Sequence, residues 1–207
     1  MALDVVLFVF QTVCPFVPPH PFHKEPLKPS SSAGYDDAIM EALKQIKVLV
    51  CDSDGVLTDG SIFVSDDGIE HRRFHVRDGL GMKLAQKAGL RIGVISGRST
   101  RSATLRLAGL EVDFVMQGIS DKGAALESLS RQAGVSLSQI AYLGDDIIDL
   151  PALKRCGFPV AVNDAVAEVK AVAAYTTQAV GGRGAVRETI ELILRAQGRW
   201  DEIVRSF

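Results

Sequence analysis

The chain has 207 residues, of which 47% are apolar, and its 23 Lys and Arg residues nearly balance its 25 Asp and Glu residues. A chain of this length buries roughly 70% of the surface of its unfolded form, so it can build its own core. Lys and Arg do not cluster, which argues against nucleic-acid binding, and no run reaches the ~18 apolar residues that would span a membrane. The three cysteines lie far apart in the sequence, as is typical of reduced cytoplasmic thiols. We expect a soluble, cytoplasmic α/β protein.

Residues 1–35 differ in composition from the rest of the chain. An apolar run at 5–10 follows an Asp, without a basic segment before it, so it makes a poor secretory signal. The next stretch contains six of the eight prolines and ends in Ser and Gly. Proline removes the backbone donors that helices and strands need. We therefore predict a disordered N-terminal extension over residues 1–35 and a folded domain over residues 36–207.

In the folded part, short apolar runs alternate with segments of helical length. The expected strands are residues 47–51, 91–95, 112–116, 140–143 and 159–162. The expected helices are residues 79–89, 100–109, 121–134, 146–157 and 183–197. Several of these helical segments end at glycine, the usual left-handed cap. Buried runs that alternate with amphipathic helices predict a parallel sheet covered on both faces.

One segment breaks this alternation directly after the first strand. Residues 61–76 indicate two strands joined at Asp66-Asp67-Gly68, and Asp-Gly is a common signal for a hairpin turn. A plain βαβ unit would place a helix here. A two-stranded ribbon is marginally stable alone in water. We therefore expect this hairpin to pack against other structure, such as the same ribbon of other subunits.

Polar side chains follow the expected strands at the edge where ligands bind in open α/β sheets. In chain order they are Asp52, Asp54, Thr58, Ser96, Arg98, Lys122, Asp145, Asp146 and Asp149, and Gly97 lies between Ser96 and Arg98. Any one of them could be only a turn former or a helix cap. Carboxylates that converge within about 4–6 Å, however, repel one another unless a cation neutralises them. Ligation by oxygen alone favours Mg²⁺, which keeps water sites free for phosphate.

The spacing of Asp52 and Asp54 suggests a mechanism. Their side chains share a side if the extended geometry of the strand continues past its end. One carboxylate could attack phosphorus to form an aspartyl-phosphate, and the other could protonate the leaving alcohol and then activate water. Arg98, Lys122 and Ser96 could bind the oxygens of the transferring group. The motifs of P-loop NTPases, dinucleotide enzymes and α/β-hydrolases are absent from the sequence.

The motifs D-S-D-G-V-L-T, S-G-R, Lys122 and G-D-D-x-x-D resemble, in this order, the four motifs of the haloacid dehalogenase superfamily of Mg²⁺-dependent phosphohydrolases. Three further segments are similar to the 3-deoxy-D-manno-octulosonate 8-phosphate phosphatases: F-H-V-R-D-G-L-G (74–81), G-D-D-I-I-D-L-P (144–151) and G-G-R-G-A-V-R-E (181–188). The resemblance covers about residues 45–200. It implies a Rossmann-like three-layer α/β fold without a cap domain, with the hairpin inserted after the first strand.

The same resemblance implies roles for individual residues. Asp52 would be nucleophile and Mg²⁺ ligand, Asp145 would complete the metal site, and Asp54 would be the general acid/base with its backbone carbonyl as a further ligand. The residues that would contact phosphate or sugar acid are Asp54, His75, Val76 (by its backbone only), Arg77, Asp78, Gly79, Lys83, Arg98, Arg106 and Lys122. Those that would support the site are Thr58, Ser96, Gly97, Asp146 and Asp149.

The resemblance also implies a homotetramer in which the hairpins join in a barrel and residues 181–184 close over a neighbouring site. Those residues could equally be a glycine-rich turn before the last helix. Cys51 and Ser53 stand where apolar residues would be expected beside Asp52. We expect Cys51 to be a small buried apolar residue and Ser53 to face away from the metal.

We therefore expect a phosphoric monoester hydrolase that uses Mg²⁺ and acts on a small-molecule sugar acid phosphate. The resemblance implies 3-deoxy-D-manno-octulosonate 8-phosphate, a precursor in lipopolysaccharide biosynthesis, as the substrate. Two alternatives stay open. One is a phosphatase of a nine-carbon sialic-acid-type phosphate. The other is a catalytically silent oligomerising module, against which the intact set of Asp52, Asp54, Lys122 and Asp145 argues.

Overall fold

A computed structural model describes residues 37–207, which lie in one compact unit. The extension predicted for residues 1–35, with Cys14, lies outside the described residues. A six-stranded sheet in the order β5-β4-β1-β6-β7-β8 forms the middle layer, and all its pairings are parallel. Its strands are β1 (Val48–Cys51), β4 (Arg91–Ile95), β5 (Phe114–Met116), β6 (Ile140–Gly144), β7 (Phe158–Ala161) and β8 (Tyr175–Thr176). The predicted parallel α/β architecture is confirmed.

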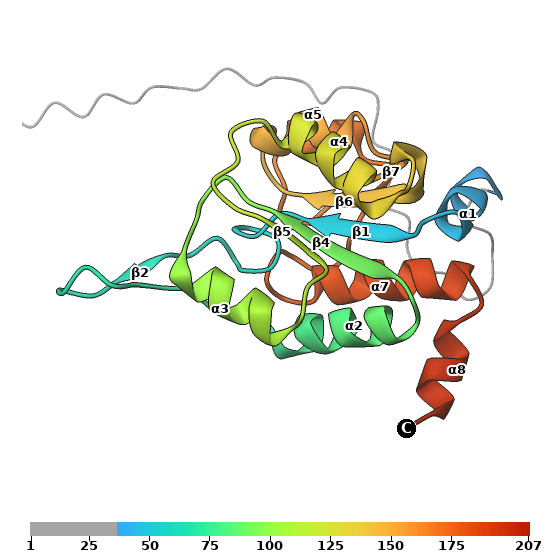
Figure 1. Cartoon of the computed structure of the whole chain (residues 1–207), viewed down its shortest axis with the longest axis horizontal. Coiled ribbons are helices and arrows are strands. Elements are labelled where there is room, and N and C mark those ends of the chain that lie inside the picture. The colour runs from blue at the N-terminus through green and yellow to red at the C-terminus, as the bar shows by residue number, and fades with distance from the viewer. Residues whose placement is uncertain (1–36) are drawn as a thin grey trace, which may run out of the picture. The chain divides into compact units, whose positions relative to one another are not determined.

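Helices cover both faces of this sheet (Figure 1). One layer contains α4 (Lys122–Ala133), α5 (Leu150–Leu153) and α6 (Ala167–Val172). The other contains α2 (Val76–Lys87), α3 (Arg101–Gly109) and α7 (Ala185–Ala196). Two further helices are α1 (Asp37–Lys44), which contacts α7, and α8 (Trp200–Arg205) near the C-terminus. None of the helices over residues 37–207 has the length and apolar character needed to cross a membrane.

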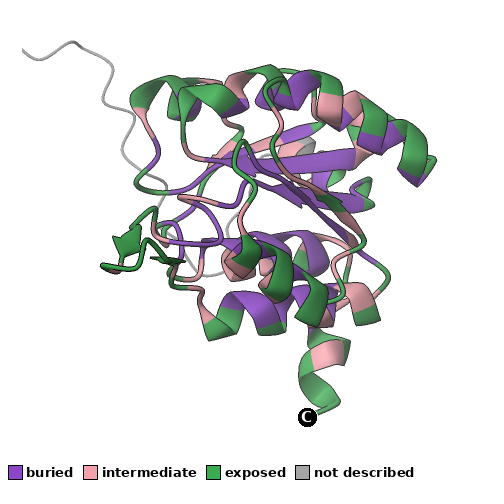
Figure 2. Ribbon diagram, turned by 60° about the vertical axis from the view of Figure 1, so that its left-hand side comes forward, coloured by how far each residue is buried: buried purple, intermediate pink, exposed green. Residues whose placement is uncertain are grey.

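The core forms where the apolar runs of the sequence meet the inner faces of the helices. All residues of β1 and β6 are buried (Figure 2), as expected for a parallel sheet covered on both sides. Gly93 of β4 allows α4 to pack closely, because a Cβ atom there would lie 2.9 Å from Leu129 Cδ1. Helix α4 begins after the Asp121 cap, whose side chain accepts the N–H of Ala124 at 3.0 Å, and it ends at Gly134 in the left-handed conformation. These contacts fix where α4 begins relative to the sheet.

The segment between β1 and α2 contains a shorter hairpin than the sequence predicts. Strands β2 (Phe63–Val64) and β3 (Glu70–His71) pair antiparallel, and Gly68 takes a positive φ of 79° in the turn. The expected second strand stops early because Val76 already begins α2. Four apolar side chains of this segment are exposed, namely Ile62, Phe63, Val64 and Ile69.

The helix predicted for residues 146–157 is wrong in its extent. A 3₁₀ turn (Ile147–Asp149) precedes the short α5 instead. Pro151 has no N–H to donate to the carbonyl four residues earlier, so it interrupts a continuous helix here. A second 3₁₀ turn (Leu137–Gln139) leads into β6. The sequence analysis also missed α1, α6, β8 and α8, which are short or lie at the edges of the fold.

Candidate active site

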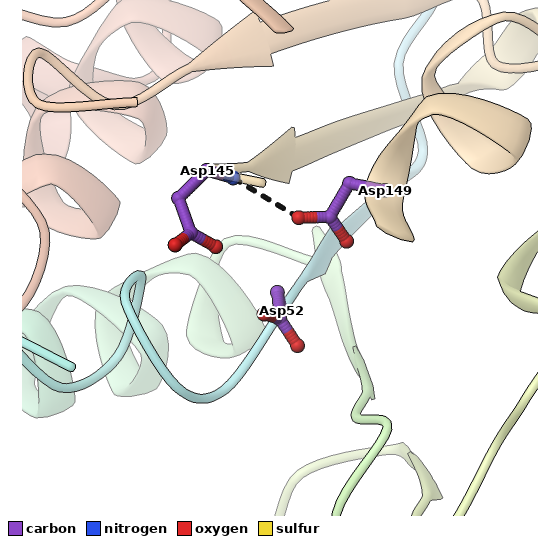
Figure 3. Close-up of side chains that lie close together, drawn as sticks. All are labelled: Asp52, Asp145 and Asp149. Atoms are coloured by element: carbon purple, nitrogen blue, oxygen red, sulfur yellow. Dashed lines mark hydrogen bonds between the residues drawn. The ribbon is translucent and has the colours of Figure 1, made fainter. Parts of the chain in front are cut away.

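Three carboxylates gather beyond the carboxyl ends of β1 and β6. Asp52 follows β1, Asp145 follows β6, and Asp149 comes from the 3₁₀ turn after it. One oxygen from each lies within 4.8 Å of the other two (Figure 3). Adjacent parallel strands end at the same edge of a sheet, so the pairing of β1 with β6 brings these distant parts of the sequence together.

Asp149 organises this cluster and is fully buried. Its Oδ1 accepts hydrogen bonds from Lys122 Nζ at 2.7 Å and from Tyr142 Oη at 2.8 Å. Its Oδ2 accepts from the backbone N–H groups of Asp145 at 3.0 Å and Asp146 at 3.3 Å. With both oxygens engaged, Asp149 holds the loop after β6 in place. Sequence reasoning missed Tyr142, although a tyrosine inside a buried strand needs a partner for its hydroxyl.

Lys122 supplies the positive charge of the cluster. It is the first residue of α4 and only 1% exposed, and its Nζ lies 2.7 Å from both Asp52 Oδ1 and Asp149 Oδ1. A cation at a helix N-terminus is electrostatically unfavourable, and these two carboxylates compensate for that position. Burial alone would lower the pKa of Lys122, but the charges of Asp52 and Asp149 raise it above its ordinary value. Lys122 is therefore a charged residue in the interior.

The remaining carboxylates of the cluster are held in an unfavourable environment for ionisation. Burial, followed by the charge of Asp149, raises the pKa of Asp52 to about 6. Burial and the charges of Asp52 and Asp149 raise the pKa of Asp145 to about 8. Asp145 Oδ1 is buried and has no hydrogen-bond partner among the described residues. A buried oxygen without a donor, beside two further carboxylates and one ammonium group, fits a bound divalent cation.

Gly55 leaves room for this arrangement. Its φ is 92°, and a Cβ atom at this position would collide with the Asp145 carboxylate. The D-S-D-G motif therefore needs its glycine both for the left-handed turn and for the approach of Asp145. Residues 53–57 form a turn, in which Leu57 N–H donates to Ser53 O at 3.0 Å.

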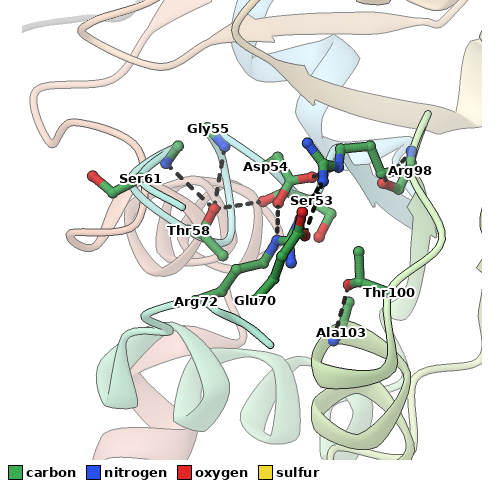
Figure 4. Close-up of polar contacts among 12 residues, drawn as sticks. Ser53, Asp54, Gly55, Thr58, Ser61, Glu70, Arg72, Arg98, Thr100 and Ala103 are labelled. Atoms are coloured by element: carbon green, nitrogen blue, oxygen red, sulfur yellow. Dashed lines mark hydrogen bonds and ion pairs between the residues drawn. The ribbon is translucent and has the colours of Figure 1, made fainter. Parts of the chain in front are cut away.

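This turn corrects the expectation that the Asp52 and Asp54 side chains share a side. The strand ends at Cys51, so its extended geometry does not continue to Asp54. The Asp54 carboxylate lies outside the acidic cluster and accepts a hydrogen bond from Arg72 Nε at 2.8 Å (Figure 4). The role predicted for Asp54 in metal binding involves its backbone carbonyl, and that role stays a prediction.

The other residues predicted at this edge mostly shape its loops. Buried Thr58 accepts the N–H groups of Gly55 and Gly60 at 3.4 and 3.3 Å. Ser96 Oγ accepts the N–H of Arg98 at 3.2 Å, across Gly97. Asp146 caps the 3₁₀ turn by accepting the N–H of Ile147 at 2.7 Å. These contacts shape the backbone of the loops, and the roles predicted for Thr58, Ser96 and Asp146 in the site stay predictions.

Arg98 reaches towards the hairpin. Its Nη2 donates to both carboxylate oxygens of Glu70 at 2.9 Å, and its Nε lies 4.0 Å from Asp54 Oδ2. Glu70 also lies 3.1 Å from Arg72 Nη2. The sequence analysis did not identify Glu70 as part of this site, because its contacts depend on how the hairpin lies against the loop after β1.

The residues predicted to contact the sugar acid lie at and beyond the start of α2, but they do not all face one space. Asp78 is buried and accepts the N–H groups of Gly184 at 3.1 Å and Arg187 at 2.8 Å, so its carboxylate holds the start of α7. His75 precedes α2 and lies 3.5 Å from Asp78. Burial raises the pKa of Asp78.

Further along α2, Arg106 of α3 packs over Gly79, where a side chain would collide with its guanidinium. Lys83 forms an ion pair with Glu111. Val76 and Arg77 are exposed. Arg77 lines a separate groove of about 430 Å³ beside α7, together with Arg183 and Arg187. Of the predicted sugar contacts, the structure thus pairs Gly79 with Arg106 and His75 with Asp78, and it directs Lys83 and Arg77 to other neighbours.

The glycine-rich segment 181–184 packs against the loop that follows Asp52. Gly182 N–H donates to Val56 O at 2.8 Å, and Gly181 N–H donates to Asp164 Oδ1 at 2.8 Å. A Cβ atom at Gly181 would collide with the carbonyl of Gly55. These contacts favour the interpretation of the segment as a tight turn before α7. Its closure over a neighbouring site stays a prediction.

Comparison with known proteins shows the family of the chain. Residues 109–188 match the family model for haloacid dehalogenase-like hydrolases. The 3-deoxy-D-manno-octulosonate 8-phosphate phosphatase of Haemophilus influenzae is 41% identical over 161 residues, which cover 78% of this chain and 89% of that protein. The Escherichia coli K12 enzyme of the same name is 40% identical over 166 residues, or 80% and 88% of the two chains. The chain belongs to the 3-deoxy-D-manno-octulosonate 8-phosphate phosphatase family.

Solved structures of this family share most of the fold described above. The crystal structure of the Moraxella catarrhalis phosphatase, in complex with a magnesium ion, a phosphate ion and a KDO molecule, has a TM-score of 0.81 and 38% identity. The match covers 84% of this chain and 99% of that one. The cobalt-bound phosphatase of Haemophilus influenzae has a TM-score of 0.75 at 42% identity, covering 77% and 93%. The predicted resemblance and fold family are confirmed, and the family's members are phosphoric monoester hydrolases.

Proposed function

We propose that the chain hydrolyses 3-deoxy-D-manno-octulosonate 8-phosphate to the free sugar acid and phosphate with the help of Mg²⁺, as a step in the synthesis of a lipopolysaccharide precursor. The buried cluster of Asp52, Asp145, Asp149 and Lys122 is the observation that carries this proposal. It supplies a nucleophile, a fixed positive charge and an unpaired acceptor for a cation. Identity of about 40% to phosphatases of this substrate supports the choice of substrate.

In the proposed reaction, Lys122 holds Oδ1 of Asp52 and orients its carboxylate towards phosphorus. A carboxylate oxygen of Asp52 forms a bond to phosphorus while the bond from phosphorus to the sugar oxygen breaks. Asp54 donates a proton to that leaving oxygen. Asp54 then takes a proton from water, which attacks phosphorus and releases phosphate and the Asp52 carboxylate.

The proposed mechanism also requires positive charge around the phosphoryl oxygens. A Mg²⁺ ion held by Asp52, Asp145 and the backbone carbonyl of Asp54 would stabilise the negative charge on the phosphoryl oxygens. Arg98 and Lys122 would bind the same oxygens. To do so, Arg98 must give up its two hydrogen bonds to Glu70 and bind the phosphoryl group instead.

A phosphate-release assay over a small panel of substrates tests the proposed function. The panel contains the eight-carbon sugar acid phosphate, a nine-carbon sialic-acid-type phosphate and glucose 6-phosphate, each with and without Mg²⁺. We expect kcat/KM for the eight-carbon substrate to exceed the other values at least tenfold. Preference for the nine-carbon phosphate would change the substrate, equal turnover of glucose 6-phosphate would indicate a generalist, and no turnover would indicate a silent module.

The raised pKa values of Asp52 and Asp145 predict how Mg²⁺ and pH act together on stability. Without a cation, the folded state binds protons at these groups more tightly than the unfolded chain does. Their contribution to the free energy of unfolding is therefore fully present below about pH 4 and is lost as the pH rises through about 6 and about 8.

Mg²⁺ competes with those protons, so it should stabilise the protein more as the pH rises from 6 to 8. Differential scanning calorimetry at several pH values, with Mg²⁺ or with EDTA, measures this gain in Tm. EDTA should also abolish turnover, and added Mg²⁺ should restore it. A gain in Tm that shrinks with rising pH, or full activity in excess EDTA, would contradict the assigned metal site.

We also propose a homotetramer that forms through the hairpin β2–β3. The exposed apolar side chains of this segment, Phe63 and Val64 among them, support this assembly because isolated ribbons are marginally stable. Light scattering should give about four times the chain mass of 22.2 kDa. Val64→Asp should reduce that mass, whereas Val204→Asp, at an exposed valine of α8, serves as the matched control. A monomeric wild-type chain would leave the exposed apolar hairpin unexplained.

We also propose a cytoplasmic location, because cysteines that form no disulfide are typical of that compartment. Cys51 and Cys156 carry free thiols among the described residues. Burial raises the pKa of both thiols, to about 12 for Cys156. This agrees with the expectation that Cys51 behaves as a small apolar residue.

A further inference from the structure

Arg72 is a buried cation to which the proposed mechanism gives no role. It follows β3 directly, and its side chain is only 1% exposed. Its Nε donates to Asp54 Oδ1 at 2.8 Å, and its Nη2 lies 3.1 Å from Glu70 Oε2 (Figure 4). Nη1 has no hydrogen-bond partner among the described residues, and Nη2 has only the ion pair with Glu70. Burial of a guanidinium that leaves part of its donors unsatisfied is costly, and such an arrangement calls for a functional explanation.

The contact with Arg72 defines where the Asp54 carboxylate lies. Oδ1 of Asp54 is bound by Arg72, while Oδ2 lies 4.0 Å from Arg98 Nε. Asp54 is only two residues from Asp52, yet its carboxylate is not part of the buried acidic cluster. Without Arg72, an Asp54 carboxylate free to rotate would be attracted to any cation bound by that cluster. A carboxylate drawn there could not serve the leaving group.

We propose that Arg72 is a positioning residue that holds the Asp54 carboxylate beside the leaving group and away from the metal cluster. The inference rests on the proposed function, in which Asp54 exchanges protons with the sugar oxygen and with water. A charge-assisted hydrogen bond from a buried guanidinium is among the strongest ways to fix a carboxylate. Glu70 accepts from Arg98 and lies beside Arg72, so the same hairpin residue steadies both arginines.

This role also gives the inserted hairpin a purpose within one chain. The hairpin occupies the position where a plain βαβ unit would place a helix, and its second strand ends at His71, one residue before Arg72. The hairpin therefore places the guanidinium of Arg72 beside Asp54, although the two residues are 18 positions apart in the sequence. Arg73, the next residue, faces the surface and pairs with Asp59 instead.

The test compares leaving groups in the wild type and in Arg72→Gln. The substrates are the sugar acid phosphate, glycerol phosphate and p-nitrophenyl phosphate. An alkyl oxygen must be protonated as it leaves, whereas nitrophenolate leaves without protonation. We expect kcat/KM to fall ~10- to 100-fold for both alkyl phosphates and by less than about threefold for the aryl phosphate, because general acid catalysis contributes 10²–10⁴-fold.

A double-mutant cycle shows whether Arg72 acts through Asp54. Asp54→Asn should show the same dependence on the leaving group, and adding Arg72→Gln to it should cause no further loss. Arg72→Lys keeps the buried charge without the Nε–H bond, so it should show the same pattern with a smaller loss, and it replaces Arg72→Gln if that variant does not fold. Arg195→Gln, on an exposed part of α7, is the control for loss of an arginine.

Three results would overturn the proposal. Equal losses for alkyl and aryl phosphates would mean that Arg72 acts on the phosphoryl group or on the fold. A loss confined to the sugar acid phosphate would mean that Arg72 contacts the sugar directly. Additive effects of Arg72→Gln and Asp54→Asn would mean that the two residues act independently. Because glycerol phosphate and p-nitrophenyl phosphate carry the comparison, an incorrect choice of sugar substrate would not be mistaken for any of these results.

Discussion

Asp52→Asn should reduce turnover by roughly 10⁴-fold or more, the scale of loss when a catalytic nucleophile is removed, while the protein still folds. An amide cannot form the acyl phosphate that the proposed mechanism requires. The fold should tolerate the change because Asp52 is one of three clustered carboxylates, two of them buried, near the ammonium group of Lys122. Loss of one negative charge relieves repulsion, so the Tm in EDTA should stay the same or rise.

Phosphate release at saturating Mg²⁺ and calorimetry in EDTA measure the two effects of this substitution. Asp121→Asn is a matched control, since it makes the same chemical change one residue before Lys122. Asn can also cap a helix, so α4 should be unaffected. If Asp52→Asn kept more than a few per cent of wild-type turnover, Asp52 would not be the nucleophile.

Lys122→Met should destabilise the protein by about 3–5 kcal/mol, the usual cost of removing one partner from a buried ion pair. Lys122 Nζ lies 2.7 Å from both Asp52 and Asp149, so the substitution leaves a buried cluster of negative charge without compensation. Methionine is of similar length, and little of the effect should come from a cavity. Catalysis should be lost as well, because Lys122 orients the Asp52 carboxylate.

Urea denaturation in EDTA measures this free energy of unfolding, with Lys154→Met after α5 as the control for loss of an exposed lysine. Mg²⁺ should recover part of the stability, because a cation bound at the cluster replaces some of the missing positive charge. A loss below about 1 kcal/mol, the range of a surface ion pair, would contradict the structural role of Lys122.

Local patterns were sufficient to predict much of the sheet. The runs that became β1 and β4 are mostly apolar and rich in β-branched residues, and the run that became β6 is mostly apolar, as is typical of parallel strands buried on both faces. Asp52, Ser96 and Asp145 directly follow or closely follow those runs, so the topology of a parallel sheet already places them at one edge. Gly55 also indicated that the chain turns sharply after the first strand, as the structure shows.

Side-chain contacts between distant segments could not be predicted in the same way. Asp78 was expected to contact the sugar, yet its carboxylate binds the start of α7 more than a hundred residues away. The helix expected after Asp145 proved to be a 3₁₀ turn followed by α5, because Pro151 interrupts its hydrogen bonds. Such outcomes depend on which donor reaches which acceptor once the chain is compact.

The sequence by itself determined which polar residues follow each strand, which family the protein belongs to and which groups are available for phosphoryl transfer. These properties follow from local periodicity and from motifs a few residues long. Only the tertiary structure decided which partner each of those groups binds. It placed Lys122 and Tyr142 on the same oxygen of Asp149, and it paired Asp54 with Arg72, the residue after the hairpin. A buried charge takes whichever partner the packed chain brings within hydrogen-bond distance, and separation along the sequence does not specify that distance.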